Sequence, residues 1–165
     1  DYETKSSYTA TVTATDGTNS TTQNITVTVT DVNDNSPVFT SSASFSAAEN
    51  QTGIGTVTAT DADSSSITFT VSGSELSISS GGVLSFTSAP DYETKSSYTA
   101  TVTVSGGTNS TTQNITVTVT DVNENAPAFT SSSSISAVEG RTSIGDLTAT
   151  DADGDSPMMV ADSIR

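Results

Sequence analysis

Hydrophobic and polar residues alternate along most of this chain with a period of two. The segment 98–104 reads YTATVTV, and the segment 115–120 reads ITVTVT. Successive side chains of a β-strand point to opposite faces, so this alternation predicts strands with one buried face. The spacing of an amphipathic helix is absent from the sequence.

The stretch 36–122 holds a full set of such segments, separated by polar and glycine-containing turns. The seven strands that we predict there cover residues 38–48, 54–60, 67–72, 75–79, 83–87, 98–104 and 112–120. The first of them is interrupted, and the last two form a hairpin across 105–109. This pattern predicts an all-β fold, a seven-stranded antiparallel Greek-key sandwich of the immunoglobulin-like kind.

The apolar members of the alternation predict the core of that sandwich. The inward positions are Val57, Ile67, Phe69, Val71, Leu76, Ile78, Leu84, Phe86, Val102, Val104, Ile115, Val117 and Val119. Such a core is small, so we expect a domain of marginal stability that gains from outside help.

The chain repeats itself with an offset of 90 residues. Segments 1–35 and 91–125 differ only at positions 14/104, 15/105, 16/106 and 34/124. Because this period is the size of a domain, the repeat predicts tandem sandwiches rather than a solenoid. We divide the chain into the C-terminal part of one repeat (1–35), a complete repeat with its linker (36–125) and the N-terminal part of the next (126–165). We expect the two partial repeats to pack poorly on their own.

Composition and charge exclude several classes of function. The formal net charge is −15, with 4 basic residues against 19 acidic ones, which argues against nucleic acid or an anionic lipid surface as a partner. Histidine and cysteine are absent, so disulfides, the usual zinc sites and His-based or Cys-based catalysis are excluded. No apolar stretch approaches the roughly 18 residues of a membrane span, so we expect no membrane insertion by this segment.

The acidic residues gather where predicted strands end and repeats meet. Two acidic, asparagine-rich linkers, 31–35 and 121–125, define a first joint and a second joint between consecutive repeats. Several carboxylates confined to one joint repel one another, and a hard divalent cation removes that repulsion. Calcium takes six to eight oxygen ligands from carboxylates, amides and carbonyls, so these joints predict calcium binding.

These motifs together resemble the cadherin repeat. The sequences DVNDNSPVF at 31–39 and DVNENAPAF at 121–129 are similar to the DxNDNxPxF linker signature of that family. The resemblance extends to Glu49, to the Asp-Ala-Asp of 61–63 and to the Asp-Tyr-Glu of 91–93, and it covers the chain to about residue 155. The richness in Thr and Ser and the lack of Cys are more typical of a bacterial surface adhesin than of an animal cadherin.

The resemblance implies calcium ions between consecutive repeats and a set of ligands at each joint. At the second joint these are Glu49, Asp91, Glu93, Asp121, the carbonyl of Val122, Asn123, Glu124, Asn125, Asp151 and Asp153. At the first joint they are Asp1, Glu3, Asp31, Asn33, Asp34, Asn35, Asp61 and Asp63. Two positions depart from the family pattern, because Glu124 replaces an aspartate and Gly106 stands where the preceding repeat has Asp16.

The function that follows is a non-enzymatic one: calcium-binding, tandem cadherin-like repeats of an extracellular, membrane-associated surface adhesin. Calcium would make the joints rigid for cell adhesion, and the partners would be neighbouring repeats of the same chain and a homophilic or cell-surface partner. An alternative is a carbohydrate-binding or accessory module of a secreted enzyme. The acids could also form an ordinary solvated surface, with Asp and Asn making turns. The EF-hand-like run 151–155 lacks the required glycine and flanking helices, which favours coincidence.

Overall fold

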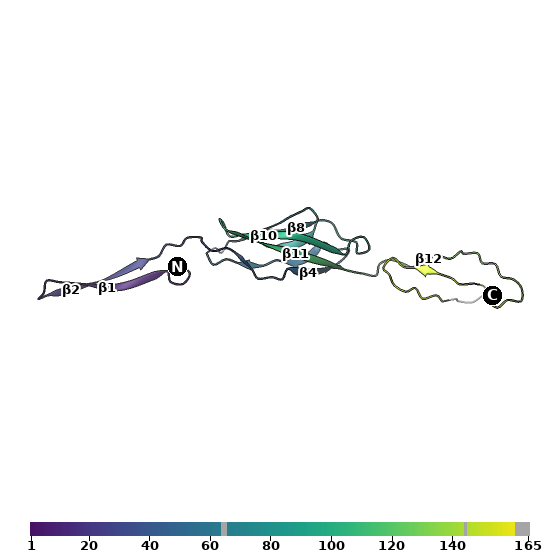
Figure 1. Cartoon of the computed structure of the whole chain (residues 1–165), viewed down its shortest axis with the longest axis horizontal. Coiled ribbons are helices and arrows are strands. Elements are labelled where there is room, and N and C mark those ends of the chain that lie inside the picture. The colour runs from purple at the N-terminus through teal and green to yellow at the C-terminus, as the bar shows by residue number, and fades with distance from the viewer. Residues whose placement is uncertain (64–65, 144, 161–165) are drawn as a thin grey trace.

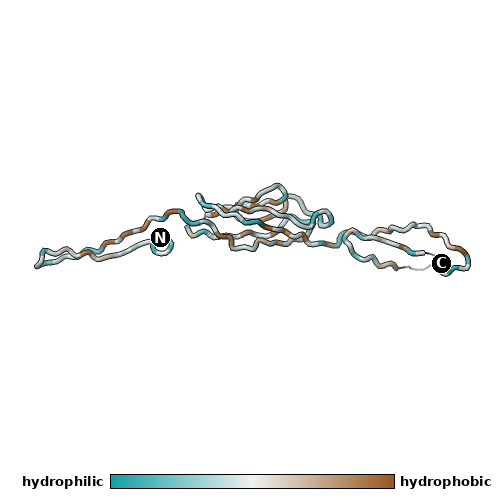
Figure 2. The backbone as a smooth tube through the Cα atoms, in the orientation of Figure 1, coloured by the Kyte–Doolittle hydropathy of each residue, from teal (hydrophilic) through white to brown (hydrophobic). Residues whose placement is uncertain are grey.

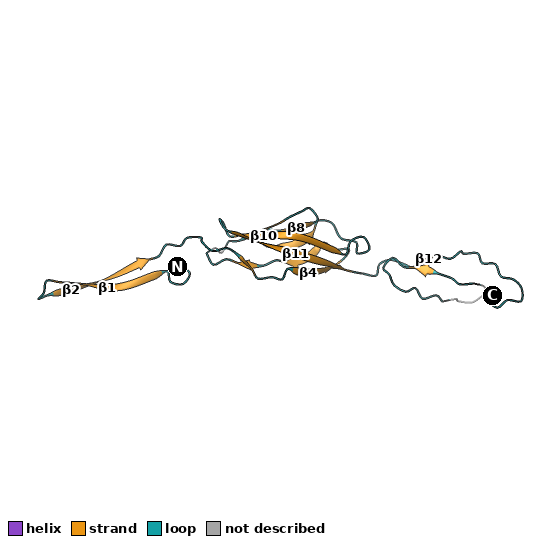
Figure 3. Cartoon of the chain, viewed as in Figure 1, coloured by secondary structure: helices purple, strands orange, loops and turns teal. Residues whose placement is uncertain are grey.

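A computed structural model describes residues 1–63, 66–143 and 145–160. Figure 1 shows three parts that follow one another along the long axis: a hairpin, a central sandwich and a C-terminal segment. The predicted all-β class is confirmed, because the regular elements of the described residues are strands. Figure 3 shows these strands concentrated in the hairpin and the central sandwich.

The N-terminal part is a hairpin of β1 (Ser7–Thr15) and β2 (Ser20–Thr28). The strands pair antiparallel from Ser7↔Thr28 to Thr15↔Ser20. Both strands are exposed along their whole length, as we expected for a partial repeat. The turn lies at the outer end of the molecule, whereas the N-terminus lies beside the first joint (Figure 1).

The central sandwich consists of the elements β3 to β11. Their bounds are β3 (Val38–Phe39), β4 (Ser44–Ala48), β5 (Gly53–Thr56), β6 (Ala59–Thr60), β7 (Thr68–Val71), β8 (Leu76–Ile78), β9 (Val83–Phe86), β10 (Ser97–Ser105) and β11 (Ser110–Thr120). One sheet has the order β4-β11-β10-β7; the others have the orders β5-β9-β8 and β3-β6. These sheets enclose a single core.

That core follows the predicted alternation closely. Ten of the thirteen predicted positions are buried, and Ile67, Val71 and Ile78 are partly buried against them. Ala47 of β4 completes the buried set, although we did not predict it. Figure 2 shows the hydrophobic residues spaced along the central strands. The tight turn before β9 needs a glycine at 82, which has a φ of 87° and a position where a Cβ would overlap the carbonyl oxygen of Val57.

Two details of the prediction need correction. The single strand that we expected over 54–60 is two strands, because β5 pairs with β9 whereas β6 pairs with β3. The chain changes sheets at Val57, whose side chain is buried and whose N–H donates to Gly82 O at 2.8 Å. The sheet pairs are antiparallel with one exception among the described residues, since β4 runs parallel to β11.

The C-terminal part contains β12 (Ala128–Phe129) and β13 (Ala149–Thr150), which pair antiparallel. They repeat the pairing of β3 with β6 at the start of the central sandwich. Residues 161–165 of the predicted third part lie outside the described residues.

Candidate metal centres at the two joints

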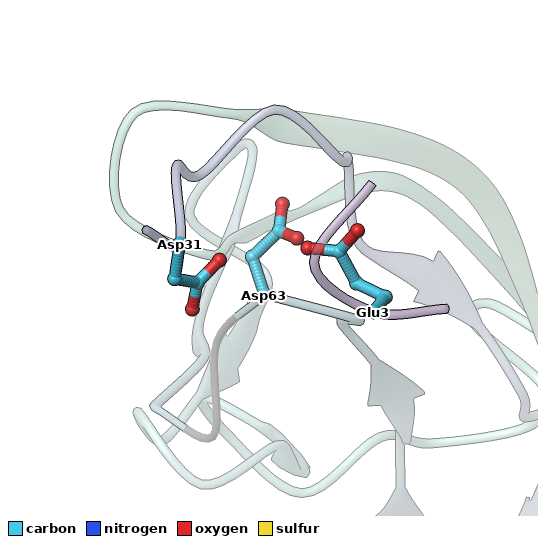
Figure 4. Close-up of side chains that lie close together, drawn as sticks. All are labelled: Glu3, Asp31 and Asp63. Atoms are coloured by element: carbon cyan, nitrogen blue, oxygen red, sulfur yellow. The ribbon is translucent and has the colours of Figure 1, made fainter. Parts of the chain in front are cut away.

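The first joint brings together carboxylates from three separate segments. Glu3 lies in the N-terminal turn, Asp31 follows β2 in the linker, and Asp63 follows β6 in the central sandwich. One carboxylate oxygen of each lies within 4.8 Å of the others. Figure 4 shows the side chains of Glu3 and Asp63 pointing toward one another, with Asp31 on the other side of Asp63.

Hydrogen bonds fix Asp63 in that position. The backbone N–H of Asn35 donates to Asp63 Oδ2 at 2.5 Å, and Asn35 Nδ2 donates to Asp63 Oδ1 at 2.7 Å. The N–H of Asp63 donates in turn to Asp61 Oδ1 at 3.0 Å, which orients the Asp-Ala-Asp turn. Asn35 Nδ2 also donates to Asp34 Oδ1 at 3.0 Å. The linker and the following sandwich are therefore held together by carboxylate–amide pairs.

The two facing carboxyls of the first joint have opposite pKa shifts. A backbone hydrogen bond lowers the pKa of Glu3, but the hydrogen bond to Asp63, loss of solvent and repulsion by Asp63 and Asp34 together raise it above the ordinary value. Loss of solvent raises the pKa of Asp63, but hydrogen bonds from Asn35 and then from Glu3 bring it below the ordinary value. Such a split is typical of two acids crowded into one site.

The second joint is organised around a buried carboxylate. Among the described residues, Glu49 is the charged residue that is buried, with 3% of its surface exposed. Its Oε1 accepts the N–H of Val122 at 2.8 Å, and its Oε2 accepts the N–H of Tyr92 at 2.8 Å. Glu49 thereby ties the end of β11 to the Asp-Tyr-Glu turn. It also lies with Glu93 and Asp121 in one group whose carboxylate oxygens are within 4.8 Å of one another.

A second group at this joint crosses from the central sandwich to the C-terminal part. It contains Glu93, Glu124 and Asp153, again with carboxylate oxygens within 4.8 Å of one another. Asp153 accepts the N–H of Asn125 at 2.8 Å and Asn125 Nδ2 at 2.6 Å. This arrangement repeats the contact between Asn35 and Asp63 at the first joint.

Three acids of the second joint have raised pKa values, whereas hydrogen bonds, first that from the Asn125 side chain, lower the pKa of Asp153. Loss of solvent and then repulsion by Asp153 and Glu49 raise the pKa of Asp121 above its ordinary value. Loss of solvent is also the main cause of the raised pKa of Glu124; a hydrogen bond from Asn50 lowers this pKa, and repulsion by Glu49 and Asp153 adds to the rise. For Glu93, a backbone hydrogen bond lowers the pKa, but loss of solvent and repulsion by Glu49 raise it overall. The joint therefore holds more negative charge than its surroundings compensate.

The structure divides the predicted site residues into two classes. Eight of them form the three carboxylate groups, with Glu93 shared by two groups: Glu3, Asp31, Asp63, Glu49, Glu93, Asp121, Glu124 and Asp153. Asp1 and Asp91 instead accept hydrogen bonds within their own turns, from Thr4 and Thr94. Asp151 accepts the N–H of Asp153 at 3.0 Å.

Sequence reasoning missed two contributors to the joints. Asp155 accepts a hydrogen bond from Asn123 and raises the pKa of Asp121 by repulsion. We had not included Asp155 among the site residues, because we assigned it only to the EF-hand-like run 151–155. Asn109 of the β10–β11 turn reaches the first linker, where its side-chain amide contacts Asn33 and Asn35. The sequence gave no signal of these contacts, because position 65, the counterpart of Asp155, is a serine and Asn109 belongs to an ordinary Asn-Ser-Thr run.

The donor set of both joints suits a hard cation. The grouped side chains offer carboxylate oxygens, and the side-chain amides of Asn35 and Asn125 donate to the carboxylates of Asp63 and Asp153. Oxygen ligands of this kind favour calcium or magnesium over the softer transition metals.

Comparison with known proteins places the fold in a recognisable class. No family model matches the chain. The chain is 36% identical over 145 residues to mouse cadherin EGF LAG seven-pass G-type receptor 1 and 34% identical to the human protein of that name. In each case the match covers 78% of this chain but only 5% of the relative's length.

Solved structures agree with these relatives. Extracellular cadherin domains 3–6 of protocadherin gamma B2 superpose with a TM-score of 0.78 and 28% identity, over 92% of this chain and 44% of that one. The corresponding domains of protocadherin gammaB7 give a TM-score of 0.78 and 29% identity, over 92% of this chain and 45% of that one. Among the described residues, no helix is long and apolar enough to cross a membrane. The bacterial source stays a prediction. The sandwich, its linkers and these likenesses together show that the chain consists of cadherin-like domains.

Proposed function

We propose that this chain is a calcium-stiffened adhesive module in which cations at the joints hold consecutive cadherin-like repeats in line. One observation carries the proposal: Asp153 follows the second linker, yet its carboxylate lies beside those of Glu93 and Glu124, which precede or belong to that linker. The group therefore spans the joint, and a bound cation would connect its two sides.

The physical role of the cation is charge compensation. Loss of solvent, followed by repulsion from neighbouring acids, raises the pKa values of Asp121 and Glu124, and the same two causes outweigh a backbone hydrogen bond to raise the pKa of Glu93. Calcium, when bound, supplies the missing positive charge and accepts hard oxygen ligands. The chain's own residues supply the positioning, because Asn125 orients Asp153 and the backbone of Val122 and Tyr92 orients Glu49.

The same reasoning extends to organisation and location. We take residues 36–125 as one repeat with its linker, and 1–35 and 126–165 as parts of its neighbours. Calcium modules of the extracellular kind bind at about 10⁻⁴–10⁻³ M, which fits an extracellular or cell-surface setting. The protocadherin gammaB7 structure is a cis-dimer, which supports homophilic contact as the kind of partner for this chain. A structural, non-catalytic role is in keeping with cadherin relatives.

The test is a calcium titration of the full chain, monitored by thermal unfolding and by small-angle scattering. Binding to the folded form alone raises the free energy of unfolding by about 2.7 kcal/mol at a calcium concentration 100 times the Kd. We expect a saturating rise in melting temperature together with a longer maximum dimension. Magnesium at the same concentrations should give a smaller change, because it demands a tighter octahedral geometry.

A matched pair of variants makes this test specific. D121N with D153N removes two acids from the second joint, and E139Q with D146N removes the same charge from exposed positions outside the three groups. The first variant should lose the calcium response of the second joint, and the control should keep it. An equal response in both variants, or none in the unmodified chain, would refute calcium ligation by these acids.

A further inference from the structure

The first linker makes a set of contacts that does not involve its carboxylates. Asn33 Nδ2 donates to the carbonyl oxygen of Gly106 at 2.6 Å. Asn109 Nδ2 donates to Asn33 Oδ1 at 2.8 Å, to Asn35 O at 2.8 Å and to Asn33 O at 3.2 Å. Thr108 Oγ1 donates to Asn33 Oδ1 at 3.3 Å. We call this set of contacts the amide clasp; it joins the linker to the β10–β11 turn more than 70 residues away in sequence.

In the clasp, several oxygen atoms surround one central atom, as the ligands of a small cation do. Three oxygens of the linker, from Asn33 and Asn35, converge on the single nitrogen Asn109 Nδ2. A side-chain amide nitrogen carries two hydrogens and no net charge, so it can donate one hydrogen to each of the two oxygens at 2.8 Å without any ion. Oxygens that already accept such hydrogen bonds would have to give them up before they could ligate a metal.

Gly106 explains why the turn can come so close. A Cβ at this position would overlap Asp61 Oδ2 and would lie 3.3 Å from Pro37 Cγ. Position 106 therefore faces the acids of the joint, and glycine brings the backbone there without adding a side chain. The preceding hairpin has Asp16 at the equivalent position, and its carboxylate accepts the N–H groups of Thr18 and Asn19 at the outer tip.

We propose that the amide clasp takes the place of a cation at the outer edge of the first joint, so that this joint is ordered without metal. The clasp fixes the linker from Asn33 onward, and the N–H of Val29 donates to Ser6 O within the hairpin. Only residues 30–32 separate these two anchored points. The order of the first joint does not depend on the proposed calcium function. The statement that the clasp takes the place of a cation does rest on that function.

The second linker differs from the first in the partner of its equivalent amide. Asn123 donates to the carboxylate of Asp155, whereas Asn33 donates to the carbonyl oxygen of Gly106 in the β10–β11 turn. The proposal therefore concerns the order of the first joint.

The experiment measures the order of each joint separately in chelator. Because the chain has no cysteine, pairs of spin labels can be introduced at exposed positions, T26C with T70C across the first joint and T70C with S132C across the second. Pulsed electron resonance then gives the distribution of distances for each pair. We expect a narrow distribution at the first joint in the absence of calcium, and the second pair reports on the calcium proposal.

Two variants break the clasp from opposite sides. N109A removes the donor in the turn, and N33A removes the acceptor in the linker, outside the sandwich, so that it cannot unfold the core. Each should broaden the first-joint distribution in chelator, and the double variant should broaden it no further, because both remove one network. The matched control is N19A, which changes the same Gly-Thr-Asn-Ser turn of the preceding repeat, at the tip far from the joint.

The outcomes separate this proposal from the calcium proposal. A first-joint distribution in chelator that is as broad in the unmodified chain as in N33A would overturn the clasp while leaving calcium binding intact. If calcium fails to narrow the second joint, the calcium proposal is refuted, but a narrow first joint that N33A broadens still supports the clasp. Broadening by N19A equal to that by N109A would also count against it.

Discussion

Two copies of nearly the same sequence, 1–35 and 91–125, fold into the same hairpin but end in different surroundings. The register of β1 with β2 is reproduced pair for pair by β10 with β11. The exposure of equivalent side chains differs sharply: Val12 is 50% exposed and Val102 is 0% exposed, and Ile25 is 39% exposed where Ile115 is 1% exposed. Strand pairing therefore follows from local sequence, whereas burial comes from the rest of the repeat.

This difference has a physical basis in how hairpins are stabilised. An isolated two-stranded hairpin is marginally stable in water, because its apolar face stays hydrated. In the central sandwich, the face of β10 and β11 is covered by Leu84 and Phe86 of β9 and by Val57. The same Thr-Val alternation thus contributes to a core in one copy and to an exposed surface in the other.

The largest effect expected from this comparison is on the free energy of unfolding. Replacement of Ile115 by alanine should destabilise the sandwich by about 2–5 kcal/mol, because it leaves a cavity in a closed core. Replacement of Ile25 should change the stability of the sandwich by less than about 0.5 kcal/mol, as is usual for exposed positions. Urea unfolding in chelator measures both. Similar losses in the two variants would mean that the first hairpin is covered as well as the second.

The next effect concerns two acids at equivalent positions of the repeat, Glu49 directly after β4 and Glu139 in the C-terminal part. E49A should destabilise the sandwich by about 1–3 kcal/mol in chelator, because the N–H groups of Tyr92 and Val122 lose their acceptor. E139A removes the equivalent exposed acid and should leave the sandwich unchanged. Hydrogen exchange at the two amides gives a direct readout. If their protection survives E49A, the carboxylate is a charge of the joint and has no structural role.

The sequence was sufficient to predict most of the strands and the core, and the reason is the strict alternation of Thr with Val and Ile. Alternation fails where a strand changes sheets: Val57 and Ala59 alternate with Thr, but Ile54 lies three residues before Val57, so the period of two is already broken next to the change of sheet. Ala47 was missed because a small residue between Ser46 and a second alanine gives a weak signal. Its burial depends on the parallel pairing of β4 with β11, which is set by tertiary contacts.

The candidate site was predictable to the extent that the repeat itself specifies it. The acids of each joint recur with the 90-residue period, so their gathering could be expected without knowledge of the fold. The contact of Asn109 with the linker could not, because an Asn after Gly-Thr reads as an ordinary turn residue. The role of Gly106 was equally hidden, since it depends on how closely the backbone approaches Asp61.

The smallest expected effect tests whether the copies differ in charge pairing as well as in burial. Lys5 and Lys95 lie over the rings of Tyr8 and Tyr98 at 4.4 and 4.3 Å, so that contact is common to both copies. Lys95 also forms an ion pair with Glu75, the one ion pair found among the described residues. K95A should therefore cost the sandwich about 0.2–1 kcal/mol in urea at low salt, the range of exposed ion pairs. K5A should cost it nothing measurable.

Salt separates the two contributions to that loss. At about 1 M salt the screening length falls to roughly 3 Å, so the attraction between Lys95 and Glu75 is largely removed, whereas packing of the lysine stem on Tyr98 remains. The cost of K95A should then shrink but stay above that of K5A. A cost that is the same at low and high salt would assign the whole effect to the packing on Tyr98. The ion pair would then contribute no measurable stability, and the two copies would differ in burial alone.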